Sequence, residues 1–401
     1  MSDLNSTPSA NRIHISFFGL RNAGKSSVVN AVTGQQLSIV SDVRGTTTDP
    51  VKKAMELLPL GPVVIYDTPG IDDEGELGAL RVKKTAEVLA HSDVAVLVAD
   101  STAGLGEADR ELVAEFEKRS IPYIIALNKC DLLAVRGETA GNTVYTSAVT
   151  GEGINELKEK LAALGKSGQT EKHILADLVT AGDTVVLVIP IDASAPKGRI
   201  ILPQQQVLRE LLEIGCNAVC TQHTSLKGAL EALSVKPRLV ITDSQVFGFV
   251  SRAVPEDIML TSFSILFARY KGSLEKLVRG AKKLSELDDN DICLISEGCT
   301  HHRQCADIGT VQIPNLIKKY TGKNPSFEFT SGGEYPDDMS KYALNIHCGG
   351  CMLNEREMKS RIKRSEEAAV PVVNYGIALA QMNGILKRSL EPFPEAAKLL
   401  K

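Results

Sequence analysis

A loop between an apolar run and a helix-like stretch constrains the fold of this chain more than any other feature. Residues 19–26 read GLRNAGKS and fit the pattern G-x-x-x-x-G-K-[ST] without a gap. The run RIHISFFGL leads into the loop and GKSSVVNAVTG leads out of it, which is the strand–loop–helix context that this motif needs. Its glycines let backbone N–H groups surround phosphates, Lys25 supplies a positive charge to them, and the Ser26 hydroxyl is placed to bind Mg²⁺. The chain is therefore predicted to contain an α/β nucleotide-binding domain.

Apolar runs alternate with helix-like stretches along the whole chain, which predicts an α/β protein. At 401 residues the chain is too long for a single ordinary core, so we expect three domains. Nearly continuous apolar runs such as SDVAVLVADS are typical of strands in a doubly wound parallel sheet. The expected parts are a mobile polar tail (1–10), a P-loop domain (11–166), a linker (164–172), a small α/β dimerisation domain (173–261) and an α/β metal-cluster domain (262–401) that opens with one helix-like run (263–287).

Three further motifs specify the nucleotide. Asn128-Lys129-Cys130-Asp131 fits N-K-x-D, and the Asp131 carboxylate can accept two N–H bonds from guanine, which adenine does not offer. Backbone N–H groups at Ser147 and Ala148 face guanine O6. Asp67-Thr68-Pro69-Gly70 fits D-x-x-G, where Asp67 holds Mg²⁺ through water and the Gly70 N–H senses the γ-phosphate. The predicted GTP and Mg²⁺ site comprises Gly19, Asn22, Ala23, Gly24, Lys25, Ser26, Ser27, Thr47, Asp67, Gly70, Asn128, Lys129, Asp131, Ser147 and Ala148.

This part of the chain resembles the Era/TrmE-like branch of small GTPases over about 150 residues. The segment GTTTD (45–49) stands where that branch has its switch threonines, and the resemblance implies that Thr47 binds Mg²⁺. Ile71 follows Gly70 where many GTPases carry a water-orienting glutamine, and an isoleucine cannot do that. In the resembling branch an asparagine at the position of Asn22 helps to bind K⁺, so we expect slow, K⁺-stimulated hydrolysis. The expected catalytic residues are Lys25, Thr47, Asp67, Gly70 and Asn22.

A second set of motifs lies in the last third of the chain. Cys299-Thr300-His301 and His347-Cys348-Gly349-Gly350-Cys351 combine into C-x-H-x(45)-H-C-x-x-C. If the strands predicted before each half (291–298 and 342–347) are parallel, both halves emerge at one edge of a sheet, where ligands collect. Three cysteines and one or two histidines suit structural zinc, and they equally suit a 4Fe–4S cluster with one iron not held by cysteine.

The combination of GTPase motifs, the middle segment PIDASAPKGRIILPQ and the C-terminal CTHH…HCGGC resembles the HydF family of FeFe-hydrogenase maturation GTPases over almost the whole chain. The resemblance implies a 4Fe–4S cluster held by Cys299, Cys348 and Cys351, and a scaffold that passes a transient diiron precursor to apo FeFe-hydrogenase. It further implies radical-SAM maturases as partners and a homodimer or tetramer. Candidates for the labile fourth iron ligand are His301, His347 and Asp192.

Other observations narrow the alternatives. A net charge of −4 and a sequence pI near 6.1 do not favour a nucleic-acid partner, and no apolar run is long enough for a membrane span, so we expect a cytoplasmic protein. The alternative function is a GTP-regulated protein with a structural Cys₃His zinc site, and a C-x-x-C oxidoreductase is a third possibility. The other cysteines are expected to have no role in metal binding. Those expected to be inert or to lie in the core are Cys130, Cys216, Cys220 and Cys293, and the one expected to be a spare thiol is Cys305.

Overall fold

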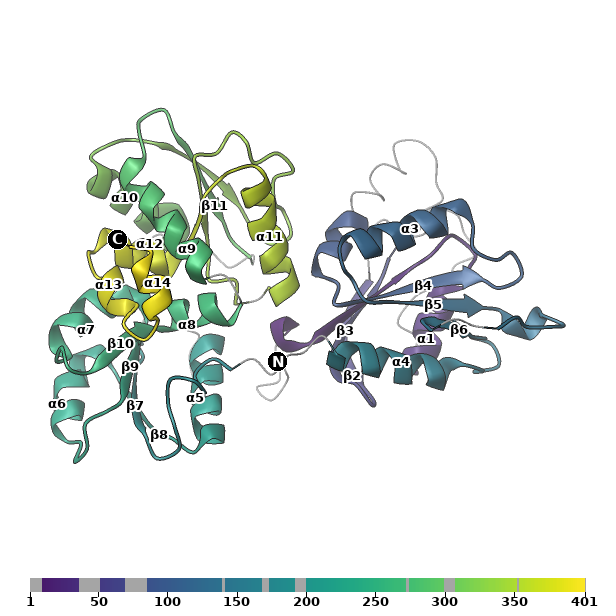
Figure 1. The fold of residues 1–401 in the computed structure, drawn as a ribbon, viewed down its shortest axis with the longest axis horizontal. Helices are drawn as coiled ribbons and strands as arrows, with labels where there is room; N and C mark the ends of the chain where they lie inside the picture. Colours follow the sequence, from purple (N-terminus) through teal and green to yellow (C-terminus); the bar gives the residue numbers. More distant parts are fainter. Residues whose placement is uncertain are drawn as a thin grey trace. The chain divides into compact units, whose positions relative to one another are not determined.

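The protein folds as two compact units, residues 1–171 and 172–401 (Figure 1). The computed structural model describes residues 9–35, 51–68, 85–138, 141–167, 173–191, 200–271, 274–298, 307–351 and 353–400. Within these ranges, no helix has both the length and the apolarity needed to cross a membrane.

A six-stranded sheet organises the first unit, in the order β2-β3-β1-β4-β5-β6. Every neighbouring pair is parallel except β2 and β3, which run antiparallel at one edge. The apolar runs predicted as strands all form strands, whereas β2 was not predicted. The strands are β1 (Ile13–Phe18), β2 (Val51–Leu57), β3 (Gly61–Asp67), β4 (Val94–Asp100), β5 (Tyr123–Asn128) and β6 (Thr143–Tyr145).

Helices cover both faces of this sheet, which confirms the doubly wound prediction. Helices α1 (Lys25–Thr33) and α4 (Ile154–Ser167) pack on one face, in a core that includes Val28 and Leu157. Helix α3 (Glu107–Lys118) packs on the other face through Leu112 and Phe116. Since α4 continues to Ser167, the linker expected at 164–172 begins inside a helix.

A four-stranded parallel sheet, β10-β9-β7-β8, begins the second unit. Cys216 is buried as expected, but Cys220 is exposed, so its assignment to the core was wrong. Cys220 lies on β8, an edge strand, and an edge strand lacks a neighbour on one side. The elements are β7 (Thr184–Val188), α5 (Leu202–Ile214), β8 (Asn217–Thr221), α6 (Leu226–Glu231), β9 (Leu239–Thr242), α7 (Phe247–Ala253) and β10 (Met259–Ser262).

A second four-stranded parallel sheet, β12-β11-β13-β14, completes this unit. The helix-like run expected at 263–287 is not one helix, because it is divided into α8, α9 and a short turn of helix at 282–286. The elements are α8 (Phe263–Tyr270), α9 (Leu274–Ala281), β11 (Ile292–Ser296), α10 (Ile313–Thr321), β12 (Ser326–Thr330), β13 (Leu344–His347), α11 (Glu355–Glu367), β14 (Val372–Asn374), α12 (Tyr375–Met382), α13 (Leu386–Ser389) and α14 (Pro394–Lys398).

The two sheets of the second unit share one hydrophobic core. Leu187 of β7, Leu266 of α8 and Ile346 of β13 are all fully buried in it. The boundary expected at 261–262 from the sequence therefore falls inside a continuously packed body.

Candidate functional site

The described nucleotide-site residues lie where parallel strands of the first unit end. The P-loop (19–24) joins β1 to α1, Asp67 ends β3, and Asn128 ends β5. Ser147 and Ala148 follow β6. In the sheet β3 lies next to β1 and β5 next to β6, with the parallel strand β4 between the two pairs, so their carboxyl ends meet at one edge, as in other open α/β nucleotide-binding folds.

Lys25 and Ser26, the first residues of α1, both contact Asp67. The Lys25 ammonium lies 3.0 Å from Asp67 Oδ1, and the Ser26 hydroxyl donates to Asp67 Oδ2 at 2.8 Å. The Lys25 and Asp67 side chains are only 10% and 7% exposed. The groups predicted to serve phosphate and Mg²⁺ are thus already within direct reach of one another.

Asn128 connects the P-loop to the loop after β6. Its Nδ2 donates to the Ala23 carbonyl at 2.9 Å, and its Oδ1 accepts the Ala148 N–H at 3.2 Å. Gly24 has a φ of +82°, and a Cβ there would come within 2.3 Å of Asn128 Nδ2. A glycine is therefore required at this point for both backbone conformation and space.

The remaining N-K-x-D residues differ in exposure. Lys129 donates to Asp100 Oδ2 at 2.6 Å, which fixes its long side chain, while Asp131 is exposed. Cys130 is fully buried, and burial raises the pKa of its thiol, in line with the inert role expected for it. Ser147 is buried and its hydroxyl accepts the Thr150 N–H at 3.1 Å.

Two other predicted nucleotide-site residues, Thr47 and Gly70, lie outside the described residues. Asn22, Gly19 and Ser27 belong to the described P-loop region, and Asn22 has a φ of +64°. That left-handed conformation is one that asparagine tolerates better than most residues.

The two strands that precede the cysteine motifs are adjacent and parallel, which is the arrangement on which the predicted convergence of the motifs depended. Ser296 of β11 pairs in register with His347 of β13, and the Cys348 N–H donates to the Ser296 carbonyl at 2.8 Å. Both motif halves therefore leave the sheet at the same edge.

Cys348 receives two backbone hydrogen bonds at this edge. The N–H of Gly298, the residue before Cys299, lies 3.1 Å from Cys348 Sγ, and the Gly350 N–H lies 3.4 Å from it. Burial nevertheless raises the pKa of the Cys348 thiol, so binding of a metal at neutral pH has to displace a proton. Two N–H donors aimed at one sulfur stabilise its thiolate, which is the form that binds zinc or the iron of an iron–sulfur cluster.

His347 is fully buried and both of its ring nitrogens are engaged. Nδ1 lies 2.8 Å from the Cys348 carbonyl, and Nε2 lies 3.3 Å from Arg361 Nη1. A carbonyl only accepts and a guanidinium only donates, so the ring is neutral with its proton on Nδ1. Burial, together with the Arg361 charge, lowers the pKa of His347 to about 3.

Three charged groups around these residues were not predicted from the sequence. Arg361 is 3% exposed and also donates to Glu357 Oε1 at 2.8 Å. Lys271 is 7% exposed and its ammonium donates to the carbonyls of Gly350 and Leu353. Glu297 accepts the Tyr375 hydroxyl at 3.1 Å and lies near Cys348.

Three of the predicted metal-site residues, Cys299, His301 and Asp192, lie outside the described residues. Within the part of the chain that the structure describes, no group of three or more His, Cys, Asp or Glu side chains is arranged to hold a metal ion. Cys348 and Cys351 both lie on the turn after β13 and are partly exposed.

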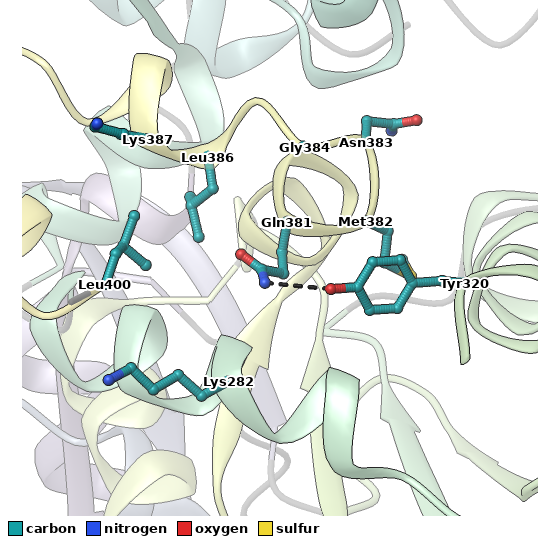
Figure 2. A pocket seen from close by; sticks show the side chains of 9 residues that line it. All are labelled: Lys282, Tyr320, Gln381, Met382, Asn383, Gly384, Leu386, Lys387 and Leu400. Carbon is teal, nitrogen blue, oxygen red and sulfur yellow. Dashed lines mark hydrogen bonds between the residues drawn. The ribbon is translucent and has the colours of Figure 1, made fainter.

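A separate pocket of about 580 Å³ lies elsewhere in the second unit (Figure 2). Lys282, Tyr320 and Lys387 line it, and Gln381 Nε2 donates to the Tyr320 hydroxyl at 3.4 Å. Its lining includes no carboxylate, thiol or imidazole, so it lacks the side chains that most often ligate metal ions.

Three family models match consecutive parts of the chain. Residues 14–129 match a family model described as a 50S ribosome-binding GTPase. Residues 174–272 match the hydrogen maturase F dimerization domain, and residues 275–392 match the hydrogen maturase F tetramerization domain.

Individual relatives cover a smaller part of the chain. The tRNA modification GTPase MnmE of Nitrosomonas europaea is 32% identical over 170 residues, which are 41% of this chain and 37% of that protein. GTPase Der of Kosmotoga olearia is 31% identical over 168 residues, 37% of this chain and 38% of its own length. The chain thus spans little more than a third of these curated relatives. The crystal structure of Era from Aquifex aeolicus bound to GDP and AlF₄⁻ has 26% identity and a TM-score of 0.34, covering 38% of this chain and 56% of that one.

The doubly wound sheet, the P-loop and the N-K-x-D loop define a P-loop GTPase. The two consecutive matches in the second unit are specific to one family of such proteins. The chain belongs to the hydrogen maturase F (HydF) family of hydrogenase-maturation GTPases, and it carries that family's dimerization and tetramerization domains.

Proposed function

We propose that this protein is an FeFe-hydrogenase maturation factor in which a GTPase unit accompanies an iron–sulfur scaffold. The supporting observation is the contact between the Gly298 N–H and Cys348 Sγ across the parallel strands β11 and β13. It brings the residue before Cys299 to the first cysteine of the C-x-x-C turn. Half-motifs about 50 residues apart in sequence thereby converge at one edge of a sheet.

The ligands of the proposed 4Fe–4S cluster are Cys299, Cys348 and Cys351. When bound, such a cluster supplies one iron whose fourth position is free of cysteine and open to exchange. His301, Asp192 and His347 are the candidates for that position. Of these, His347 has both nitrogens engaged, so it would have to give up its contact with Arg361 before it could reach iron.

The substrate of the scaffold is a diiron fragment carrying CO, CN⁻ and a dithiolate bridge, which apo FeFe-hydrogenase receives. Radical-SAM maturases supply the fragment in this scheme. The protein acts as a homodimer or tetramer, in keeping with the two oligomerization domains it matches.

GTP is bound by the P-loop and the N-K-x-D loop, and Lys25, Ser26 and Asp67 hold its phosphates and Mg²⁺. Hydrolysis then acts as a timer, because bound GTP orders switch loops that relax when the γ-phosphate leaves. K⁺ held near Asn22 offsets the charge that develops between the phosphates, in place of an arginine finger.

Anaerobic reconstitution with iron and sulfide tests the scaffold. The wild-type protein is expected to turn brown, and Cys299→Ser, Cys348→Ser and Cys351→Ser should each lose most of the iron and fail to activate apo-hydrogenase. Cys220→Ser is the matched control, because Cys220 is an exposed cysteine on a different sheet. A colourless wild-type protein that takes up only zinc would refute the scaffold and establish the structural zinc site instead.

A further inference from the structure

Lys271 is a buried cation that reaches the cysteine turn from another element. It directly follows α8, and its side chain crosses to the turn after β13. Its ammonium donates to the Gly350 carbonyl and, at 3.0 Å, to the Leu353 carbonyl. In sequence, these two carbonyls flank Cys351. The chain before α9 is thus fastened directly to the predicted ligand turn.

Among the described residues, no carboxylate forms an ion pair with this ammonium, although Glu357 and Glu355 act on it from farther away. Both of its hydrogen-bond acceptors are neutral carbonyls, and none of the ion pairs found among the described residues includes Lys271. A cation so deeply buried is costly unless negative charge lies nearby. The arrangement is therefore incomplete as a purely structural one.

Deprotonation of Cys351 and Cys348 on this turn would place negative charge close to Lys271. Burial lowers the pKa of Lys271, while negative charge at Cys351 and Cys348 is the strongest influence in the opposite direction, followed by Glu357 and Glu355. A cluster bound by three thiolates is an anion, and reduction makes it more negative. Nearby charge and hydrogen bonding are among the factors that set the reduction potential of such clusters.

We propose that Lys271 is the positioning and charge-balancing residue of the Cys348–Cys351 turn: it fixes the turn through two carbonyls and offsets the negative charge of the bound cluster. The inference rests on the proposed function, because the anion concerned is the cluster. Lys271 acts through the turn and its charge, and it donates no electron pair to iron.

The test separates charge from shape. Lys271→Gln keeps a neutral hydrogen-bond donor and removes the charge, whereas Lys271→Arg keeps the charge. Lys276→Gln is the control, because Lys276 lies on the neighbouring helix α9, is 54% exposed and pairs with Glu366 at 2.8 Å. Each variant is reconstituted with iron and sulfide, and its cluster is titrated electrochemically with detection by electron paramagnetic resonance.

Lys271→Gln is expected to shift the cluster to a more negative reduction potential, because the reduced, more anionic state loses its nearby cation. Lys271→Arg and Lys276→Gln should stay close to the wild type. If Lys271→Gln lost the cluster while Lys271→Arg kept it, and circular dichroism showed that both variants are folded, the result would also support a role for the positive charge of Lys271.

Two results would overturn the inference: an unchanged potential in Lys271→Gln, or equal loss of the cluster from folded Lys271→Gln and Lys271→Arg. A wild-type protein that binds no cluster at all would instead refute the proposed function, so the two failures are distinguishable.

Discussion

Arg361 offers the sharpest test of how the second unit supports its cysteine turn. Helix α11 carries two arginines one turn apart that both lie over the Tyr335 ring, with guanidinium carbons 5.2 Å (Arg361) and 5.4 Å (Arg364) from its centre. Arg361 is 3% exposed and donates to His347, Glu357 and the Gly332 carbonyl. We expect Arg361→Met to destabilise β13 strongly.

The magnitude follows from what the substitution leaves behind. Glu357, whose side chain is 17% exposed, loses its partner at 2.8 Å, and the buried Nε2 of His347 loses its donor. Breaking a buried ion pair by removing one partner costs about 3–5 kcal/mol. Because Glu357 keeps some contact with water, the lower end, about 3 kcal/mol, is the expected loss.

Arg364→Met is the matched control. Arg364 is 36% exposed and pairs with Asp337, which is 75% exposed, so the loss should be about 0–1 kcal/mol. The contact with Tyr335 is lost in both variants and cancels in the comparison.

Hydrogen exchange read by mass spectrometry suits a chain of two units, because a single global unfolding free energy is poorly defined for it. Peptides covering β13 should exchange about a hundredfold faster in Arg361→Met, while peptides from the first unit should be unchanged. Equal effects of the two substitutions on β13 would refute the reasoning, since burial would then not distinguish the two arginines.

Three further predictions concern both units. Lys25→Ala should abolish tight GTP binding but leave the iron content unchanged, as measured by calorimetry and iron analysis, since Lys25 lies in the first unit. GTP hydrolysis should be faster in K⁺ than in Na⁺ at matched ionic strength, and Asn22→Ala should remove the difference; equal wild-type rates would exclude a K⁺ site. Metal-free protein should lose stability in acid because the pKa of His347, about 3 when folded, is near 6.5 when unfolded. The unfolded state takes up the proton first, so this stability is present above about pH 6.5 and lost as the pH falls towards 3. By about pH 5 the wild-type protein should have lost about 2 kcal/mol of stability. Hydrogen exchange of β13 should show that His347→Gln does not lose this stability in acid.

The parts of the fold that the sequence predicted are those with strong local patterns. The runs containing β11 and β13 were predicted as strands that end in the two cysteine motifs, and the structure shows that these strands are parallel neighbours. Strand β2 escaped prediction because charged residues interrupt the apolar ones in its sequence, VKKAMEL, and its residues are mostly exposed at a sheet edge. The exposure of Cys220 was missed for a related reason, because the sequence of a strand does not tell whether the strand lies at the edge or in the middle of its sheet.

Lys271 was missed because it comes from a distant segment of the chain. Lys271 is 79 residues from Gly350, and no local pattern relates the two. Arg361 was recoverable in principle: it lies in the highly charged helix EREMKSRIKRSEE, but on the same face as Met358 and Ile362, at helical spacing. An arginine on the apolar face of such a helix indicates that its guanidinium group is buried and hydrogen-bonded to other buried groups.

The nucleotide site and the cysteine turn both lie at the carboxyl ends of parallel strands, but the lysine at each place has a different kind of partner. In the first unit, Gly24 bends the chain into α1, and Lys25 already has the Asp67 carboxylate as its partner. In the second, Gly350 has a φ of +60° in the turn after β13, and Lys271 meets only neutral carbonyls there. An incoming phosphate therefore has to compete with Asp67 for Lys25, whereas an anion bound by the cysteine turn gains a cation that no carboxylate among the described residues neutralises. The first arrangement suits a ligand that binds and leaves, and the second suits one that is retained.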